Sequence, residues 1–221
     1  MELLAEGPHE AARLDALRRC HVVGTEPEEA FDALAELAAI VCDTPIALVS
    51  LVDETRLWFK SRIGFEHDSV PRELSYCDRA IRGDDVFVVH DISKDPEVAH
   101  HPLVAGPPHL RFYAGAPLRT SSGFNLGTLC VVDRIPRRLS ERQLQALRTL
   151  ARHVVDELES RADAALLRHE LRTPLTSIRG ALGLLASGAM GELGPEARNL
   201  VTIAERNAVR LVGVINGMLD K

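Results

Sequence analysis

The chain has 221 residues, of which 46% are hydrophobic and 26% charged, and its formal net charge is −6. This composition is that of a folded globular protein and argues against disordered or fibrous classes. The acidic balance gives no support to nucleic-acid binding, which needs a basic face. No apolar run approaches the roughly 18 residues of a membrane helix, and the N-terminus lacks the basic start of a secretion signal. We therefore expect a cytoplasmic protein that binds neither nucleic acid nor membrane.

The distribution of aromatic residues divides the chain into two parts. The six phenylalanines, two tyrosines and one tryptophan all lie before Asn125, and none lies between Asn125 and Lys221. Large rings fill the thick core of a sheet-and-helix domain, whereas aliphatic side chains suffice for a thin helical bundle. The sequence predicts an α+β domain followed by an all-α module.

A helix is predicted early in the first part. Thr25 and Glu28 have the spacing of a capping box, and the helix is expected to end near Ala39. Its buried stripe is expected to consist of apolar residues at helical spacing: Phe31, Leu34, Leu37 and Ala38.

Strands are predicted over residues 46–52, 56–63, 86–89, 112–118 and 125–132. The first of these is apolar on both faces apart from Ser50, as is typical of a central strand. Residues 119–123 form a hairpin-like connection, and residues 106–108 form a loop. Together these signals predict an antiparallel sheet flanked by helices.

The second part consists of helical runs. Ser140 and Gln143 have the spacing of another capping box, and a helical pattern then continues without a break past His169. Three glycines at positions 188, 191 and 194 end it. Pro195 suits the first position of a last helix, because its missing N–H costs nothing there.

The long helix carries a heptad seam with a phase fault. Leu144, Leu147, Ala151, Val154 and Leu158 alternate steps of three and four. The next step is a second four, to Ala162, because Arg161 occupies the place that the strict repeat requires. Such a stutter locally unwinds a supercoil, and it predicts a two-state element between the two parts.

Regular seams follow on both sides of the glycine-rich turn. They consist of Leu171, Leu175, Ile178, Leu182 and Leu185 before it, and of Ala197, Val201, Ala204, Ala208, Leu211, Ile215 and Met218 after it. A lone hairpin cannot bury two such narrow stripes, so we expect a parallel homodimer that forms a four-helix bundle. The alternative is that the hairpin packs on the first domain.

The strongest local signal is the run from His169 to Thr176. If Leu171 faces the core, His169 points to solvent, because two residues correspond to about 200° around a helix. Thr173 and Thr176 then share that exposed face. Pro174 predicts a bend beside the histidine, since it removes a backbone hydrogen bond.

These residue types suit the chemistry of a phosphorylated histidine. Glu170 can accept the ring N–H of His169 and leave the other nitrogen nucleophilic. Thr173 can position water for hydrolysis. On these residues alone, a solvated surface histidine without a function is an equal alternative.

The run His169–Thr176, with the glycine-rich turn and residues 206–211, resembles the HisKA-type dimerisation and phosphotransfer module of sensor histidine kinases over about residues 166–221. The resemblance implies that His169 accepts phosphate from ATP, that Glu170 assists the transfer, and that Thr173 serves dephosphorylation of a response regulator. It also implies a homodimer and a receiver-domain partner.

ATP and Mg²⁺ are expected on a separate ATP-binding domain, in cis or in trans. Nothing in these 221 residues resembles that domain or a P-loop. We therefore expect a truncated kinase that is inactive by itself and binds no cofactor.

The first part resembles a GAF sensory domain. The residues that carry the resemblance are 45–53, 58–61, 75–77, 111–118 and 126–133. This resemblance implies an unknown small ligand, and the context by which bilins attach is not recognisable.

Two clusters have weaker alternatives. A GAF-like fold could bring Cys77 and Cys130 together near the pocket, and some GAF proteins reduce methionine sulfoxide with cysteines; we favour two buried small residues. His100, His101 and His109 have metal-binding side chains, but solvated loop histidines are favoured and no metal is expected.

The predicted organisation is an N-terminal helical segment (1–24), a GAF domain (25–139), a connecting signalling helix (140–165) and a HisKA helical hairpin (166–221). The predicted function is that of a cytoplasmic sensor histidine kinase of a two-component system. The alternative is a non-catalytic dimeric GAF adaptor that docks a response regulator.

Overall fold

The structure is a computed structural model that describes residues 8–73, 75–188 and 191–217; within these ranges the side chains of residues 8, 168, 169 and 215–217 lie outside the description. The chain divides into two compact units, Met1–Arg161 and Ala162–Lys221. In the described ranges, no helix has the length and apolarity that a membrane crossing requires.

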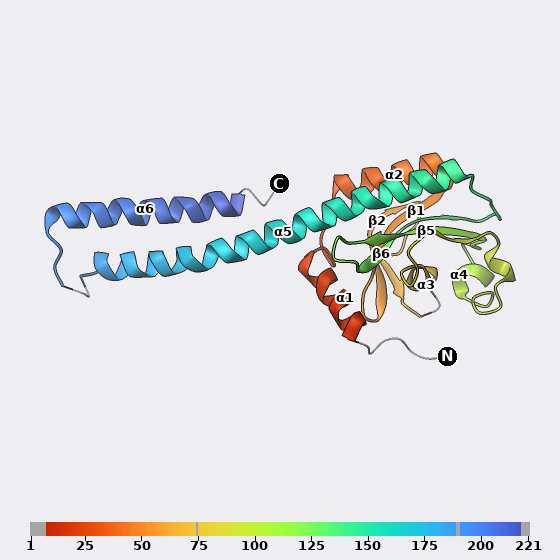
Figure 1. Cartoon of the computed structure of the whole chain (residues 1–221), viewed down its shortest axis with the longest axis horizontal. Coiled ribbons are helices and arrows are strands. Elements are labelled where there is room, and N and C mark those ends of the chain that lie inside the picture. Colours follow the sequence, from red (N-terminus) through yellow and green to blue (C-terminus); the bar gives the residue numbers. More distant parts are fainter. Residues whose placement is uncertain (1–7, 74, 189–190, 218–221) are drawn as a thin grey trace. The chain divides into compact units, whose positions relative to one another are not determined.

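The first unit contains one antiparallel sheet of six strands in the order β3-β2-β1-β6-β5-β4 (Figure 1). All five predicted strands form, and the short edge strand β3 was not predicted. Every residue of the central strands β1 and β6 is buried, which explains why β1 is apolar on both faces. The strands are β1 Ile46–Val52, β2 Arg56–Ile63, β3 Ser69–Pro71, β4 Phe87–Val89, β5 Phe112–Arg119 and β6 Asn125–Asp133.

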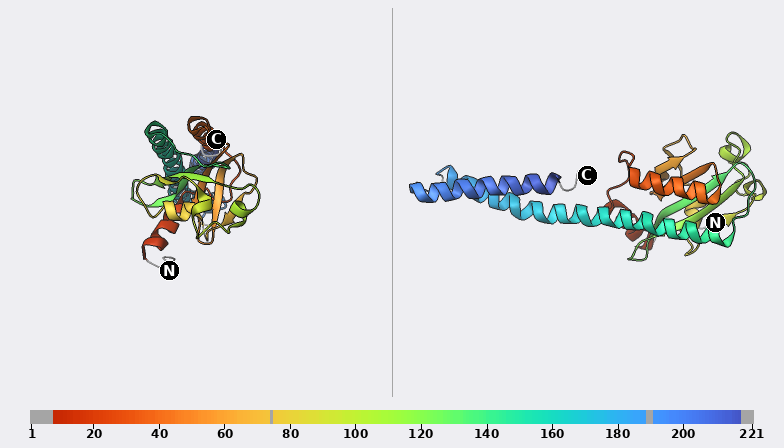
Figure 2. Two further views of the ribbon diagram at one scale, coloured as in Figure 1. Left: turned by 90° about the vertical axis from the view of Figure 1, so that its right-hand side faces the viewer. Right: turned by 90° about the horizontal axis from the view of Figure 1, so that it is seen from above.

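Helices cover both faces of the sheet. Figure 2 shows α2 and the first part of α5 together on one face, and α3 lies against β5 and β6 on the other. The helices are α1 Pro8–Arg19, α2 Glu29–Cys42, α3 Tyr76–Ala80, α4 Pro102–Ala105, α5 Glu141–Ala186 and α6 Pro195–Gly217, with a 3₁₀ turn at Ile92–Lys94. The α+β architecture and the helical second part are as predicted.

The predicted start of α2 is wrong. Its N-cap is Glu28, which makes no side-chain cap hydrogen bond. The Thr25 hydroxyl instead donates to the Val22 carbonyl at 2.8 Å and accepts from the Lys60 ammonium at 2.8 Å. A long-range contact therefore uses the hydroxyl that local spacing assigned to the helix.

The predicted buried stripe of α2 is also partly wrong. Leu37 is 47% exposed, whereas Phe31 is buried. Six residues separate the two, about 240° around the helix, so they cannot share a face. The face on the sheet consists instead of small residues and one ring, Phe31, Ala35, Ala38, Ala39 and Cys42.

The first part of α5 is buried by its own domain. The Ser140–Gln143 capping box forms: the Gln143 amide N–H donates to Ser140 Oγ at 3.4 Å, and the Ser140 amide donates to Gln143 Oε1 at 2.9 Å. The helix then runs antiparallel along α2, because Gln143 donates to the Val41 carbonyl at one end and Arg161 donates to Glu28 at the other. The predicted seam positions Leu147, Ala151, Val154 and Leu158 are all buried in the single chain, so this stretch is not left open for a coiled coil.

One carboxylate joins the core to the end of this unit. The Lys60 side chain is fully buried, and its ammonium lies 2.5 Å from Glu28 Oε1 and 2.6 Å from the Glu26 carbonyl. The other Glu28 oxygen accepts from the Arg161 guanidinium. We call Lys60, Glu28 and Arg161 the Glu28 clasp. Arg161 is the residue that interrupts the heptad repeat, so the fault in the seam is the place where α5 is ion-paired to its domain.

The second unit is a helical hairpin that leaves much apolar surface exposed. The rest of α5 and α6 form its two arms, and α6 begins at Pro195 as predicted. Ala208 is buried, whereas Leu211 is 51% exposed. The side chain of Ile215 and all of Met218 lie outside the described residues. Other exposed apolar residues of the second unit are Leu166, Leu167, Leu171, Ile178, Leu184, Leu200, Ile203, Val209 and Val214.

We expect Glu28→Gln to lower the free energy of unfolding of the first unit by about 1–3 kcal/mol, because it leaves the buried Lys60 ammonium without its counter-charge while solvent screens the partly exposed carboxylate. Urea denaturation followed by circular dichroism measures the change. Glu29→Gln, at an exposed neighbouring position, is the matched control and should shift stability by less than about 0.5 kcal/mol. Equal effects of the two variants would contradict the importance of the clasp.

Candidate functional site

The predicted phosphoacceptor segment lies within α5. His169 is helical, and the orientation of its side chain lies outside the described residues. Glu170 and Thr173 are both exposed on the helix surface. The Thr176 hydroxyl donates to the Arg172 carbonyl at 2.8 Å, so it is engaged by its own helix. The predicted role of Thr173 in positioning water rests on its place four residues after His169 in the same helix.

Pro174 lies inside α5, which continues to Ala186. Because proline has no N–H, the carbonyl of Glu170 receives no hydrogen bond from position 174. The helix therefore carries a local gap in its hydrogen-bond ladder one turn after the histidine. This gap is what the sequence predicted as the cause of a bend.

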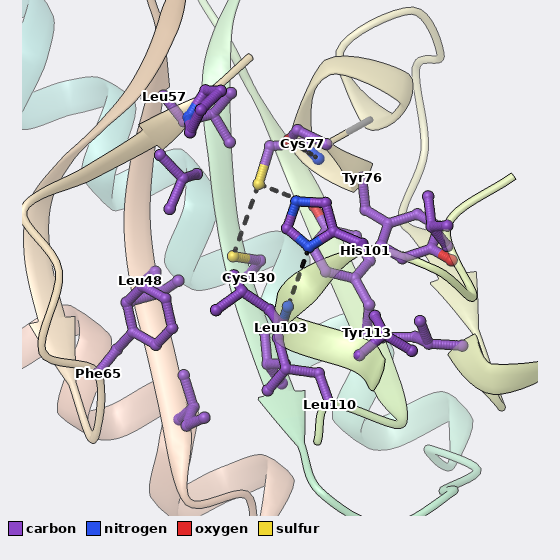
Figure 3. A pocket seen from close by; sticks show the side chains of 18 of the residues that line it. Leu48, Leu57, Phe65, Tyr76, Cys77, His101, Leu103, Leu110, Tyr113 and Cys130 are labelled. Atoms are coloured by element: carbon purple, nitrogen blue, oxygen red, sulfur yellow. Dashed lines mark hydrogen bonds between the residues drawn. The ribbon is translucent and has the colours of Figure 1, made fainter. Parts of the chain in front are cut away.

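The first unit contains a cavity of about 100 Å³ between the sheet and α3 and α4 (Figure 3). Its lining is almost entirely apolar, which suits a small ligand that is bound by shape and a few polar groups. Residues from β1, β2, β5, β6, α3 and α4 contribute. Labelled examples are Leu48, Leu57, Phe65, Tyr76, Cys77, His101, Leu103, Leu110, Tyr113 and Cys130.

Two thiols meet at the wall of the cavity. Cys77 Sγ lies 4.0 Å from Cys130 Sγ, and the Tyr113 hydroxyl donates to Cys77 Sγ at 3.4 Å. The predicted approach of these two cysteines is confirmed. Gly115 makes room for this arrangement, because a Cβ at that position would lie 2.2 Å from the Tyr113 hydroxyl oxygen.

The pKa values of the two thiols are shifted in opposite directions. The Cys130 hydrogen bond lowers the pKa of the Cys77 thiol, and hydroxyls of Thr128, Tyr113 and Ser50 act in the same direction against the effect of burial. The pKa of Cys130 is raised by that same contact with Cys77 and by burial. Cys77 is therefore the member of the pair that ionises first.

The short helix α3 is held over the cavity by an ion pair and a ring. Arg79 donates to Asp95 Oδ2 at 2.7 Å, and the Tyr76 hydroxyl donates to the same oxygen at 3.1 Å. The guanidinium also lies 5.5 Å from the centroid of the Tyr76 ring. Burial and the Asp95 charge raise the pKa of Tyr76, so this hydroxyl stays a hydrogen-bond donor.

The expectation of solvated loop histidines is wrong for His101. Its Nδ1 accepts from the Leu103 amide at 3.2 Å and caps α4, and the residue lines the cavity. Among the residues that the structure describes, no group of three or more His, Cys, Asp or Glu side chains is placed to hold a metal.

Sequence reasoning missed Tyr113 and the Glu28 clasp. The sequence contained a signal for Tyr113. Tyr113 and Gly115 lie two residues apart on the same face of a predicted strand, so the tyrosine ring has a neighbour without a side chain. The clasp has no local signal, since Glu28, Lys60 and Arg161 are far apart in the sequence.

Comparison with known families agrees with this architecture. Residues 26–158 match the model of the GAF domain, and residues 164–220 match that of the His Kinase A (phospho-acceptor) domain. The chain belongs to the GAF family and carries a HisKA domain after its GAF domain.

Individual relatives resemble the GAF part. A cyclic di-GMP phosphodiesterase from Pseudomonas aeruginosa is 44% identical over 134 residues, which are 60% of this chain and 23% of that protein. The chain therefore spans about a quarter of the length of this relative.

Solved structures show the same fold. The GAF domain of an Acinetobacter phosphoenolpyruvate-protein phosphotransferase is 18% identical, covers 67% of this chain and 93% of its own, and has a TM-score of 0.52. The PixJ GAF domain of Thermosynechococcus elongatus, in its blue-light absorbing form, is 16% identical, covers 72% and 95%, and has a TM-score of 0.50.

We expect Tyr113→Phe to raise the pKa of Cys77 by roughly 0.5–1 pH unit, because a hydrogen bond to the thiolate worth about 1 kcal/mol is lost. The ultraviolet absorbance of the thiolate as a function of pH measures it. Burial raises the pKa of Cys20 and Cys42 to about 11, so they do not titrate in the same range. The control is Tyr76→Phe, which removes a hydroxyl that is hydrogen-bonded to Asp95. A similar rise of the Cys77 pKa in this variant would contradict the role of the Tyr113 hydroxyl.

Proposed function

We propose that the chain is the sensory and phospho-accepting portion of a cytoplasmic sensor histidine kinase. The observation that carries the proposal is α5, a single helix of 46 residues. It begins on the GAF domain and contains His169, Glu170, Thr173 and Pro174 of the HisKA domain. A change in the GAF domain that shifts this helix acts on the phosphoacceptor region without any intervening linker.

The cavity of the GAF domain supplies the sensory site. It is apolar, with few polar groups, and α3 and α4 lie over it. A small neutral molecule that fills it would change the packing of α3 against β5 and β6. The similarity of this domain to a segment of a cyclic di-GMP phosphodiesterase supports its interpretation as an input module that is joined to different outputs.

The Glu28 clasp lies at the point where a ligand-induced shift of the GAF domain would reach the HisKA part of α5. The two compact units divide between Arg161 and Ala162, which is also the position of the stutter. Arg161 is held by Glu28, whereas the helix beyond it belongs to the second unit. The proposed two-state element is therefore the turn of α5 between Leu158 and Ala162, with one end fixed to the GAF domain.

His169 is the proposed phosphoacceptor. Its imidazole takes the terminal phosphoryl group of ATP, which a separate ATP-binding domain presents with Mg²⁺. Glu170 holds the proton of the other ring nitrogen, so that the attacking nitrogen keeps its lone pair. The phosphoryl group then passes to an aspartate of a response regulator receiver domain, and Thr173 positions water when the regulator is dephosphorylated.

The second unit is proposed to dimerise. Leu171, Ile178 and Leu211 of its seams are 38%, 49% and 51% exposed in the single chain. Burying apolar surface of this kind stabilises at roughly 25 cal/mol per Å². A second copy of the hairpin covers both stripes at once in a four-helix bundle, as the heptad spacing predicts.

We expect His169→Gln to abolish labelling of the chain when it is incubated with radiolabelled ATP and a HisKA-type ATP-binding domain. The label should be acid-labile and alkali-stable, as a phosphoramidate is. His153→Gln, which changes another exposed histidine of α5, is the matched control and should be labelled like the wild type. Absence of label on the wild-type chain would favour the non-catalytic adaptor instead.

We expect Leu211→Asp to shift the chain from dimer to monomer, because a carboxylate would have to be buried in the bundle. Light scattering coupled to gel filtration measures the mass. Thr202→Asp, at an exposed position of α6 outside the seam, should remain dimeric. A wild-type chain that is monomeric at high micromolar concentration would contradict the proposed four-helix bundle.

A further inference from the structure

A pair of thiols stands in the wall of the cavity and takes no part in the proposed phosphotransfer. Cys77 lies in the first turn of α3 and Cys130 in the middle of β6; both side chains are buried, and their sulfur atoms are 4.0 Å apart. A disulfide requires a sulfur–sulfur distance of about 2.05 Å. The two atoms therefore need to approach by about 2 Å to form a bond.

The two elements differ in how easily they can supply that movement. Cys130 is fixed by the sheet, because β6 pairs with Leu48 of β1 on one side and with Gly115 of β5 on the other. Cys77 belongs to a helix of five residues, whose first turn is capped by the Ser75 hydroxyl. A small shift of α3 toward β6 can close the distance, whereas a shift of β6 would break the sheet.

The surroundings favour reaction at Cys77. A thiolate is the nucleophilic form of cysteine, and the Tyr113 hydroxyl donates to Cys77 Sγ at 3.4 Å. The Cys130 thiol is the other neighbour of this sulfur atom, and their contact lowers the pKa of Cys77. The pair therefore provides one sulfur that ionises and a second sulfur that stays protonated beside it.

Access to the pair is selective. Both cysteines line the cavity, and so do Pro71 and Glu73, which are exposed to solvent. The cavity thus extends from the surface to the thiols. A volume of about 100 Å³ and an apolar lining admit a small neutral molecule but exclude large or charged ones such as a peptide disulfide.

We propose that Cys77 and Cys130 form a dithiol site that is oxidised to an intramolecular disulfide by a small hydroperoxide such as hydrogen peroxide. The Cys77 thiolate attacks one peroxide oxygen, the O–O bond breaks, and the departing hydroxide takes up a proton. This leaves a sulfenic acid on Cys77. The Cys130 sulfur then attacks the Cys77 sulfur, the S–O bond breaks, and water leaves with the Cys130 proton. In sum, two thiols lose two electrons, and the peroxide is reduced to two molecules of water.

The other two cysteines are internal controls. Cys20 and Cys42 are both buried, and burial raises the pKa of each to about 11. Neither has a thiol beside it among the hydrogen bonds of the described residues. They should stay reduced under conditions that oxidise the pair.

The test treats the reduced chain with hydrogen peroxide at neutral pH, followed by alkylation in denaturant and mass spectrometry of the unreduced peptides. We expect a disulfide-linked peptide pair of Cys77 and Cys130 that dithiothreitol restores to thiols. Loss of the Cys77 thiol should be at least about tenfold faster than loss of Cys20 or Cys42, because a pKa of about 11 leaves those two almost entirely protonated at neutral pH. Oxidised glutathione without peroxide should leave the pair reduced.

Variants separate the two steps. Cys130→Ser should stop at the sulfenic acid of Cys77, which dimedone traps once denaturant has opened the chain, and Cys42→Ser should form the disulfide like the wild type. Circular dichroism shows that each variant is folded. Oxidation of all four cysteines at one rate, or a Cys77 that is alkylated in full after peroxide treatment, would overturn the proposal. The result is independent of whether His169 accepts phosphate, because no ATP or partner is present.

Discussion

The shared carboxylate of Glu28 is the interaction on which the link between the two parts depends. A lysine whose side chain is fully buried needs a counter-charge, and Glu28 supplies it at 2.5 Å. The remaining oxygen is then available to Arg161 at the end of the first unit. The same charge that makes the β2 lysine tolerable in the core therefore fixes the last turn of α5 that belongs to the GAF domain.

This arrangement explains why the helix changes character at one point. Before Arg161 its apolar residues are buried by the domain that it covers, and beyond Ala162 many of them are exposed in the single chain. An arginine in the seam would be costly inside a coiled coil, but here it has a partner. The heptad fault marks the change from packing on one's own domain to the surface that we assign to a second copy.

The opposite face of the sheet serves another purpose. There the helices are short: α3 has five residues, four of them buried, and it is also held by the Ser75 cap and by the contacts of Arg79 and Tyr76 with Asp95. A short helix responds to a ligand more readily than the central strands do, because its displacement breaks no hydrogen bonds of the sheet. The cavity and its two thiols lie between this adjustable layer and the rigid sheet. The sheet therefore has one face covered by the long helices α2 and α5 and one face that borders the cavity.

The sequence by itself determined the α+β first part, five of the six strands, the capping box at Ser140 and the helix that starts at Pro195, because apolar periodicity and turn chemistry act locally. It also identified the HisKA segment around His169, whose roles stay predictions. Only the tertiary structure decided that Thr25 contacts Lys60, that Leu37 faces outward, that His101 lines the cavity and that Arg161 pairs with Glu28. These outcomes depend on which residues distant in sequence meet across the sheet, and no local pattern carries that information.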